Sequence, residues 1–220
     1  MHIPDGFVNA PVSIAGGVVA VAGLALCSRN LGPSLRDRDI PLAGLAAAFF
    51  LVLEAPIFPI GVGTGGHLLG GTLAVALLGP WLGPVVISVV LVVQALFAGD
   101  GGVTALGVNA VNMALIPAVV GYPLILGLRK VLPKTKLWVA IACGLAGFVS
   151  VTAGAVLYSL EYAVGGATAV PPVTVAVTTI GTYTVIAVFE GLVTGLIVAA
   201  LLRLRPDLVR VGRHLTRASA

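Results

Sequence analysis

The chain has 220 residues, of which 59% are hydrophobic and only 9% are charged, and its formal net charge is +4. A soluble domain carries roughly 25% charged residues, so most of this surface must face lipid. Intrinsic disorder is excluded because a disordered chain is poor in hydrophobic residues. A basic balance in a soluble protein would suggest nucleic acid, but here the positions of the charges indicate membrane topology instead.

Seven apolar runs predict membrane-spanning helices, each of which needs about 20 residues. The runs cover residues 8–28, 41–59, 62–79, 83–98, 105–128, 137–159 and 180–202. The third and fourth runs are short and are separated by Gly79 and Pro80. A single helix over 67–98 is therefore an alternative, and it would give six crossings.

The basic residues distinguish between these two counts. All 12 lysines and arginines follow the first, fifth or seventh run: Arg29, Arg36 and Arg38; Arg129, Lys130, Lys134 and Lys136; Arg203, Arg205, Arg210, Arg213 and Arg217. With seven crossings they all lie on one side of the membrane, as the positive-inside rule requires. We therefore expect an all-α, polytopic membrane protein of one membrane domain over 1–220. Its N-terminus is outside, and a basic tail over 203–220 lies in the cytoplasm beside anionic lipid headgroups.

The N-terminal segment 1–7 carries chemistry that suits a metal ion. It lacks the basic start and small-residue cleavage site of a signal peptide, so we expect Met1 to keep a free amine on the outer face. The amine, the amide nitrogen of residue 2 and an imidazole nitrogen of His2 can all reach one cation, closing a five-membered and a six-membered chelate ring. Planar nitrogen sites of this kind suit Ni(II) and Cu(II).

A fourth nitrogen is expected from His67. The chain has three histidines; His214 is in the predicted cytoplasmic tail, whereas His67 lies near the predicted outer end of the third run. The turn-forming sequence Pro4-Asp5-Gly6 directs the first residues back into the helix bundle, toward the depth of His67. The alternative is that both outer histidines are ordinary polar residues with hydrogen-bond partners.

The opening Met1-His2-Ile3-Pro4-Asp5-Gly6-Phe7 resembles the first residues of the NikM/CbiM family, the nickel- and cobalt-specific substrate-binding components of energy-coupling factor transporters. The resemblance continues in the sequences GVGTGGHLLGG at 61–71, DGGVTALG at 100–107 and NAVNM at 109–113. These blocks cover the first 115 residues, and the predicted spans and charges resemble the family over essentially the whole chain.

The resemblance implies a fold and a ligand set. It implies a six-helix core over 41–202, preceded by an additional helix over 8–28 that lets the segment 1–7 insert into the core. The ligands would be the amine of Met1, the amide and imidazole of His2 and the imidazole of His67. Pro4-Asp5 resembles nickel members more than cobalt members, so Ni(II) is the expected ligand and Co(II) the alternative.

The resemblance also implies partners. No GxxxxGK[ST] sequence occurs in the chain, so we expect no enzyme activity and a dependence on separate ATP-binding subunits. A transmembrane coupling component and a small accessory membrane subunit would complete the transporter in a prokaryotic plasma membrane. The pair Ala43 and Ala47 corresponds to alanines that contact the coupling component in related proteins; packing within the chain is the alternative.

The remaining candidates are polar residues in apolar runs. Glu54 and Glu190 are expensive to place in a membrane and usually face a cavity or partner, so a proton-coupled secondary transporter using them is a different class of function to consider. Asn109 and Asn112 are buried amides, one of which we expect to orient a histidine ring. Thr64 and Glu54 are further candidates for contacts around the metal ligands, and structural hydrogen bonding is the alternative for all of them.

Overall fold

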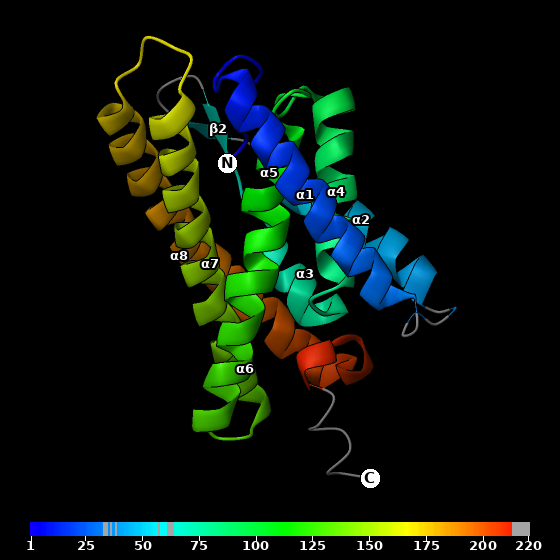
Figure 1. The fold of residues 1–220 in the computed structure, drawn as a ribbon. Coiled ribbons are helices and arrows are strands. Elements are labelled where there is room, and N and C mark those ends of the chain that lie inside the picture. Colours follow the sequence, from blue (N-terminus) through cyan, green and yellow to red (C-terminus); the bar gives the residue numbers. More distant parts are fainter. Residues whose placement is uncertain (33–34, 36, 38, 57, 61–63, 213–220) are drawn as a thin grey trace.

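A computed structural model describes residues 1–32, 35, 37, 39–56, 58–60 and 64–212. This part is almost wholly helical (Figure 1). The α-helices are α1 (Ala10–Leu31), α2 (Asp39–Glu54), α3 (Gly71–Leu78), α4 (Leu82–Val93), α5 (Leu106–Ala110), α6 (Tyr122–Val131), α7 (Lys136–Gly165) and α8 (Pro172–Leu204). The π-helical turn Gln94–Ala98 extends α4, and two more, Val111–Leu115 and Pro117–Gly121, join α5 to α6.

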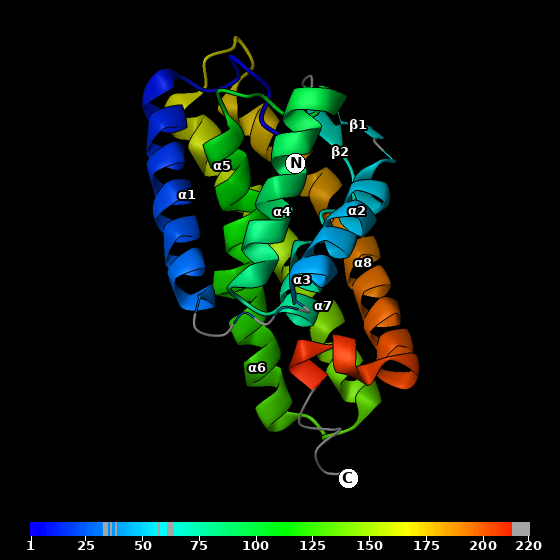
Figure 2. The ribbon, with the colours of Figure 1, turned by 90° about the vertical axis from the view of Figure 1, so that its right-hand side faces the viewer.

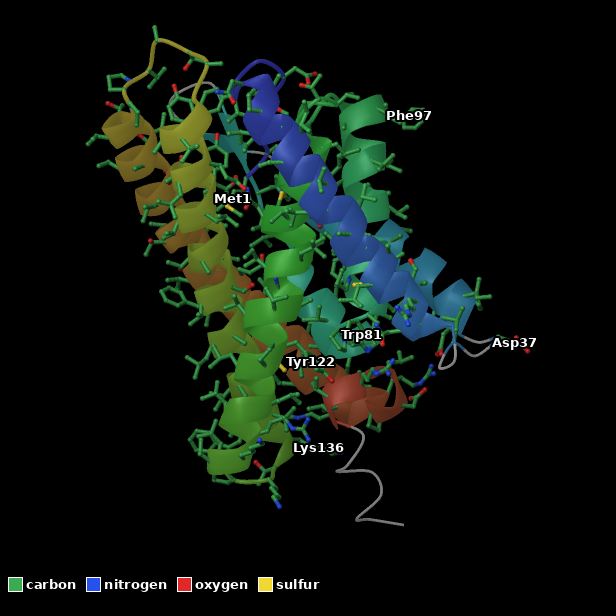
Figure 3. The ribbon with its side chains drawn as sticks, in the orientation of Figure 1. Met1, Asp37, Trp81, Phe97, Tyr122 and Lys136 are labelled. Carbon is green, nitrogen blue, oxygen red and sulfur yellow. The ribbon has the colours of Figure 1, made fainter. Side chains whose placement is uncertain are left out.

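Helices of membrane length confirm a multi-pass membrane protein. Four described helices are long and apolar enough to cross a bilayer: Ala10–Leu31, the continuous helix Leu106–Val131, Lys136–Gly165 and Pro172–Leu204. Leu82–Ala98 is a shorter apolar helix. Large apolar side chains point outward from the bundle, and Phe97 is 83% exposed (Figure 3). Such a surface is stable only against lipid, while the number of crossings and the side of each terminus stay predictions.

The predicted helix over 62–79 is wrong. Thr64–Gly66 forms strand β2, which pairs with strand β1 (Phe58–Ile60) in an antiparallel hairpin, and the helix α3 covers only Gly71–Leu78. The physical reason is local, because the glycine-rich sequence at 61–71 is a poor helix former. The predicted helix over 41–59 also ends early, at Glu54, because Pro56 and Pro59 lack the N–H that a helix needs. The described chain is therefore not purely helical. Apolar composition alone did not distinguish this hairpin from a helix.

The last helix also starts earlier than predicted, at Pro172 rather than 180. Proline is well suited to the first turn of a helix because its missing N–H is not needed there. The hydroxyl groups of Thr178 and Thr184 donate to the carbonyls of Thr174 and Ile180 four residues earlier. These bonds satisfy the threonine hydroxyls within the helix, so a threonine-rich stretch continues as α8.

Close packing between helices explains several glycines. The antiparallel helices α7 and α8 approach most closely at Gly144 and Gly191, where an added Cβ on either residue would lie 2.7 Å from the other's carbonyl oxygen. Small residues at such crossings let helices in lipid gain contact area. The helix α1 lies at the edge of the bundle against α5 (Figure 2), and only Ala20, Cys27 and Leu31 of it are buried. It is a peripheral addition to the remaining helices.

The N-terminal segment does not simply extend α1. Its backbone is tied to the α7–α8 connection by Asn9 N–H to the Gly165 carbonyl (2.7 Å) and by Ala167 N–H to the Phe7 carbonyl (3.0 Å). Before Phe7 the chain turns inward, so that Met1 lies among the helices (Figure 3). The predicted turn at Pro4-Asp5-Gly6 is confirmed: Gly6 has φ of 74°, and Phe7 N–H donates to the Pro4 carbonyl.

The described basic residues lie at or after the C-terminal ends of α1, α6 and α8, whereas Arg36 and Arg38 lie outside the described residues. The C-terminal ends of α1, α6 and α8 all lie in the lower half of Figure 1. After α8 the chain returns toward α3, where the Arg210 guanidinium donates to the Leu78 carbonyl at 3.2 Å. Arg213, His214 and Arg217 lie outside the described residues.

Candidate metal centre

The backbone of Ile3 fixes the depth of the inserted N-terminus. Asn109 on α5 holds this residue from both sides: its side-chain oxygen accepts from Ile3 N–H at 2.7 Å, and its side-chain N–H donates to the Ile3 carbonyl at 3.1 Å. Gly102 N–H donates to the same carbonyl at 2.9 Å. Asn109 thus grips the peptide next to His2 and does not orient a histidine ring directly.

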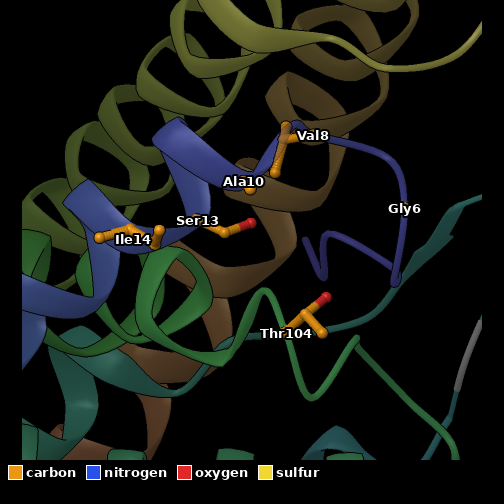
Figure 4. A pocket seen from close by; sticks show the side chains of 6 residues that line it. All are labelled: Gly6, Val8, Ala10, Ser13, Ile14 and Thr104. Atoms are coloured by element: carbon orange, nitrogen blue, oxygen red, sulfur yellow. The ribbon is translucent and has the colours of Figure 1, made fainter.

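Asp5 binds the N-terminal segment to the loop that precedes α5. Its carboxylate accepts from the backbone N–H groups of Thr104 (2.8 Å) and Val103 (3.2 Å), and from the Thr104 hydroxyl. These bonds, the hydroxyl first, lower the pKa of Asp5 below its usual value. A surface pocket of about 480 Å³ lies beside this contact, between the segment, α1 and Thr104 (Figure 4). Its lining is mostly apolar and offers no strong metal ligand.

Met1 is buried, with a side chain that is 1% exposed. Its methyl group lies against α7 at Gly154, where an added Cβ would be 2.5 Å from Met1 Cε. Burial lowers the pKa of the α-amine from 8.0 to about 5, although the nearby carboxylates of Asp100 and Glu54 act in the opposite direction. At neutral pH the amine is therefore uncharged and presents a lone pair to the interior.

Two imidazoles face each other beside this amine. The ring centroids of His2 and His67 are 4.9 Å apart and the rings are inclined by 31°. His67 Nδ1 is 2.5 Å from the Leu68 carbonyl, which only accepts, so Nδ1 carries the hydrogen and Nε2 the lone pair. The Nε2 atoms of both rings are buried and have no hydrogen-bond partner in the described part of the chain. Each such buried atom costs about 1–3 kcal/mol unless a ligand satisfies it.

The two nitrogens of His2 face different neighbours. Nδ1 lies toward Gly101, where an added Cβ would be 2.6 Å from it. Nε2 lies 3.7 Å from a carboxylate oxygen of Asp100. The six-membered chelate ring expected from the sequence closes through Nδ1, because that nitrogen is the one adjacent to Cγ. An ion held by the Asp100 carboxylate and Nε2 would therefore use a different nitrogen of His2 from the one that closes this chelate ring.

Asp100 is the candidate ligand that the sequence reasoning did not select. Its Oδ2 atom is 3.7 Å from His2 Nε2 and 3.8 Å from His67 Nε2. One ligand atom from each of these three residues lies within 4.8 Å of the others. Burial raises the pKa of Asp100. The available signal was its position between the predicted runs 83–98 and 105–128, as the first residue of the DGGVTALG sequence at 100–107.

The two carboxylates expected inside the membrane have hydrogen-bond donors as partners. Glu54 accepts from the Gln94 amide at 2.9 Å and lies 4.0 Å from His67 Nδ1. Glu190 accepts from the backbone N–H groups of Leu69 and Gly70, each at 2.8 Å. Glu190 therefore holds the chain between His67 and α3, and Glu54 lies beside the buried imidazole of His67.

The other predicted residues lie elsewhere. Asn112 donates to Glu161 at 2.6 Å rather than to either histidine. The Thr64 side chain lies outside what the structure describes, although its backbone is part of β2. Ala43 and Ala47 are partly buried against the apolar core, and their contact with a coupling component stays a prediction.

These observations define a multi-pass membrane protein with a buried cluster of nitrogen donors beside Met1. A family model described as "CbiM: Cobalt uptake substrate-specific transmembrane region" matches residues 2–208, and the chain belongs to this family.

Some similar proteins are named for nickel and others for cobalt. A fused nickel transport protein NikMN of Rhodobacter capsulatus is 40% identical over 166 residues, which cover 74% of this chain and 47% of the relative. The chain thus spans about half the length of that relative. A putative metal transport protein of Haloquadratum walsbyi is 32% identical over 209 residues, 95% of this chain and 93% of the relative. A cobalt transport protein CbiM of Clostridioides difficile is 28% identical over 164 residues, 74% of this chain and 66% of the relative.

Solved structures share the fold over nearly the whole chain. A crystal structure of a transition metal transporter superposes with a TM-score of 0.85 at 27% identity and covers 100% of both chains. A truncated transition metal transporter gives a TM-score of 0.82 at 30% identity and covers 92% of this chain and 99% of the other.

Proposed function

We propose that the chain binds one Ni(II) ion with high affinity at the outer face of a prokaryotic plasma membrane. The ligands are the amine of Met1, the amide nitrogen and imidazole of His2, and the imidazole of His67. The observation that carries the proposal is the pair of buried imidazole nitrogens without a partner among the described residues, next to a buried amine whose pKa is about 5. A cation would satisfy all three groups together.

The donor atoms favour nickel over cobalt. Amine, amide and imidazole nitrogens suit a planar site, and Ni(II) binds a given set of nitrogen ligands more tightly than Co(II). The inserted segment supports this arrangement because Asn109 and Asp5 hold it at two points. Co(II) as the ligand is the alternative within the same function, since relatives are named for either metal.

We propose further that the chain is the substrate-specificity subunit of an ATP-driven energy-coupling factor importer. Its sequence contains no phosphate-binding loop of the GxxxxGK[ST] type, so energy would come from separate ATP-binding subunits. A transmembrane coupling component and a small accessory membrane subunit are the other proposed partners. A proton-coupled transporter has less support, because both oxygens of Glu190 accept backbone hydrogen bonds.

Equilibrium nickel binding to single-histidine variants tests the ligand set. We expect His2→Ala and His67→Ala each to reduce nickel affinity by at least a hundredfold, because each removes a ligand from a four-nitrogen set. His214→Ala is the matched control, since it changes the third histidine of the chain and should leave binding intact. If all three variants bind nickel equally well, the proposed site is wrong.

A further inference from the structure

Asp100 occupies a special place in the site, because it touches both imidazoles and also reaches solvent. Its side chain is 11% exposed, whereas the side chains of His2 and His67 are 3% and 0% exposed. A hydrated cation that approaches from the outside therefore meets the carboxylate before it meets either buried nitrogen. Carboxylate oxygen is also a good ligand for a cation that still carries water.

The distances fit a shared ion. Two atoms that bind one transition metal, each about 2.1 Å from it, are at most roughly 4.2 Å apart. The Asp100 oxygen lies within that limit of both Nε2 atoms, at 3.7 Å from His2 and 3.8 Å from His67. Both Nε2 atoms are buried and have no hydrogen-bond partner among the described residues, and one ligand atom from each of the three residues lies within 4.8 Å of the others, so a small adjustment of the side chains brings all three to one ion.

The loop is built to hold the carboxylate there. Gly99 and Gly101 flank Asp100 with φ angles of 65° and 89°, a left-handed conformation that side chains disfavour. Asp100 N–H donates to the Gln94 carbonyl at 3.1 Å. A side chain at Gly101 would also collide with the His2 ring, whose Nδ1 would lie 2.6 Å from the added Cβ. Glycine at this position lets the loop close over His2 and direct Asp100 inward.

We infer that Asp100 is the capture ligand for the cation, and this inference rests on the proposed function. In the first step, the Asp100 carboxylate and the Nε2 atoms of His2 and His67 replace three water molecules on the hydrated ion, and no proton is released. In the second step, the His2 ring turns to bring Nδ1 to the ion; Nε2 leaves the ion and the ring proton moves from Nδ1 to Nε2 through water, so the imidazole releases no net proton. The amine and the deprotonated amide of residue 2 then complete the nitrogen set, the carboxylate leaves the ion, and the amide proton passes to solvent.

Two-step binding has a kinetic signature. Stopped-flow mixing of the purified chain with Ni(II), followed by nickel absorbance and by a pH indicator, should show two phases. The rate of the first rises with nickel concentration and releases no proton, while the second is independent of concentration and releases one. Asp100→Asn should slow the first phase at least tenfold, as expected when a charge that attracts an approaching ion is lost. The second phase should be unchanged, which also shows that the variant is folded.

A matched control removes another outer carboxylate. Glu161→Gln changes a side chain that bonds to Asn112 rather than to an imidazole, and both of its phases should resemble those of the unaltered chain. The inference is overturned if Asp100→Asn behaves like Glu161→Gln, or if binding has a single phase that releases the proton at once. Failure of the proposed function is distinguishable, because His2→Ala would then leave the bound nickel unaffected.

Discussion

The grip of Asn109 on Ile3 can be broken without removing any proposed ligand. Asn109→Leu deletes two buried hydrogen bonds. One is donated by Ile3 N–H to the Asn109 side-chain oxygen (2.7 Å), and the other is donated by the Asn109 side-chain N–H to the Ile3 carbonyl (3.1 Å). The carbonyl keeps the bond from Gly102, but the N–H loses its partner. A buried donor without a partner costs about 1–3 kcal/mol. We take about 2 kcal/mol as the loss in docking of the N-terminus, which corresponds to roughly a thirtyfold weaker nickel affinity at about 1.4 kcal/mol per factor of ten.

The assay is calorimetric nickel titration, with Asn112→Leu as the matched control. Asn112 is also buried and also makes a short hydrogen bond, but to Glu161. It should lower the temperature of unfolding and leave nickel affinity within a few-fold of the unaltered chain. The reasoning is refuted if both variants lose affinity equally, or if Asn109→Leu binds nickel as tightly as the unaltered chain.

Three further perturbations test other parts of the site. Gly154→Val places side-chain atoms where Met1 Cε lies, 2.5 Å from the added Cβ; overpacking of this kind costs about 1–3 kcal/mol, so nickel affinity should fall about tenfold or more, and an unchanged titration would contradict the seating of Met1. Nickel affinity should fall about tenfold for each pH unit of acidification, because binding releases the amide proton of residue 2. It should fall more steeply below about pH 5, where the buried amine takes up a proton. A steeper fall that begins near pH 8 would show that the amine is exposed. Glu190→Leu removes the acceptors for the Leu69 and Gly70 N–H groups and should destabilise the fold by about 2–6 kcal/mol in thermal unfolding, at about 1–3 kcal/mol for each buried donor. Glu190→Gln keeps one acceptor oxygen for these two N–H groups, so it should destabilise the fold less and retain nickel uptake in the assembled transporter; loss of uptake in a Glu190→Gln variant that folds and binds nickel would favour proton coupling.

The long helices could be predicted well from the sequence, because a run of apolar residues within each helix is enough to identify it. The apolar runs 8–28 and 137–159 correspond to α1 (Ala10–Leu31) and α7 (Lys136–Gly165). Three of the four predicted ends lie within three residues of the observed ones, and α7 continues six residues beyond the predicted end. The run 62–79 failed because hydropathy does not register the loss of helix propensity at the glycines inside it, Gly63, Gly65, Gly66, Gly70 and Gly71. A window that averages hydropathy therefore predicts a helix where a hairpin forms.

The site was only partly predictable. His2 and His67 could be selected because their chemistry, their predicted depth and a resemblance to known sequences agreed. The roles of Asp100 and Asn109 depend on which residues meet across the bundle: Asn109 bonds to a residue 106 positions away. Such pairings follow from tertiary packing, which no local pattern encodes.

The most direct test of the central proposal concerns the free amine of Met1. Nickel content and calorimetric titration should be measured on the chain with its native N-terminus and on a chain with one added residue before Met1. A chain with one residue added at its C-terminus serves as the control for the change in length. We predict one tightly bound nickel in the native and control chains and none in the N-terminally extended chain, because the extension converts the amine into an amide and displaces the buried Met1. Equal nickel binding by all three chains would contradict the proposed site.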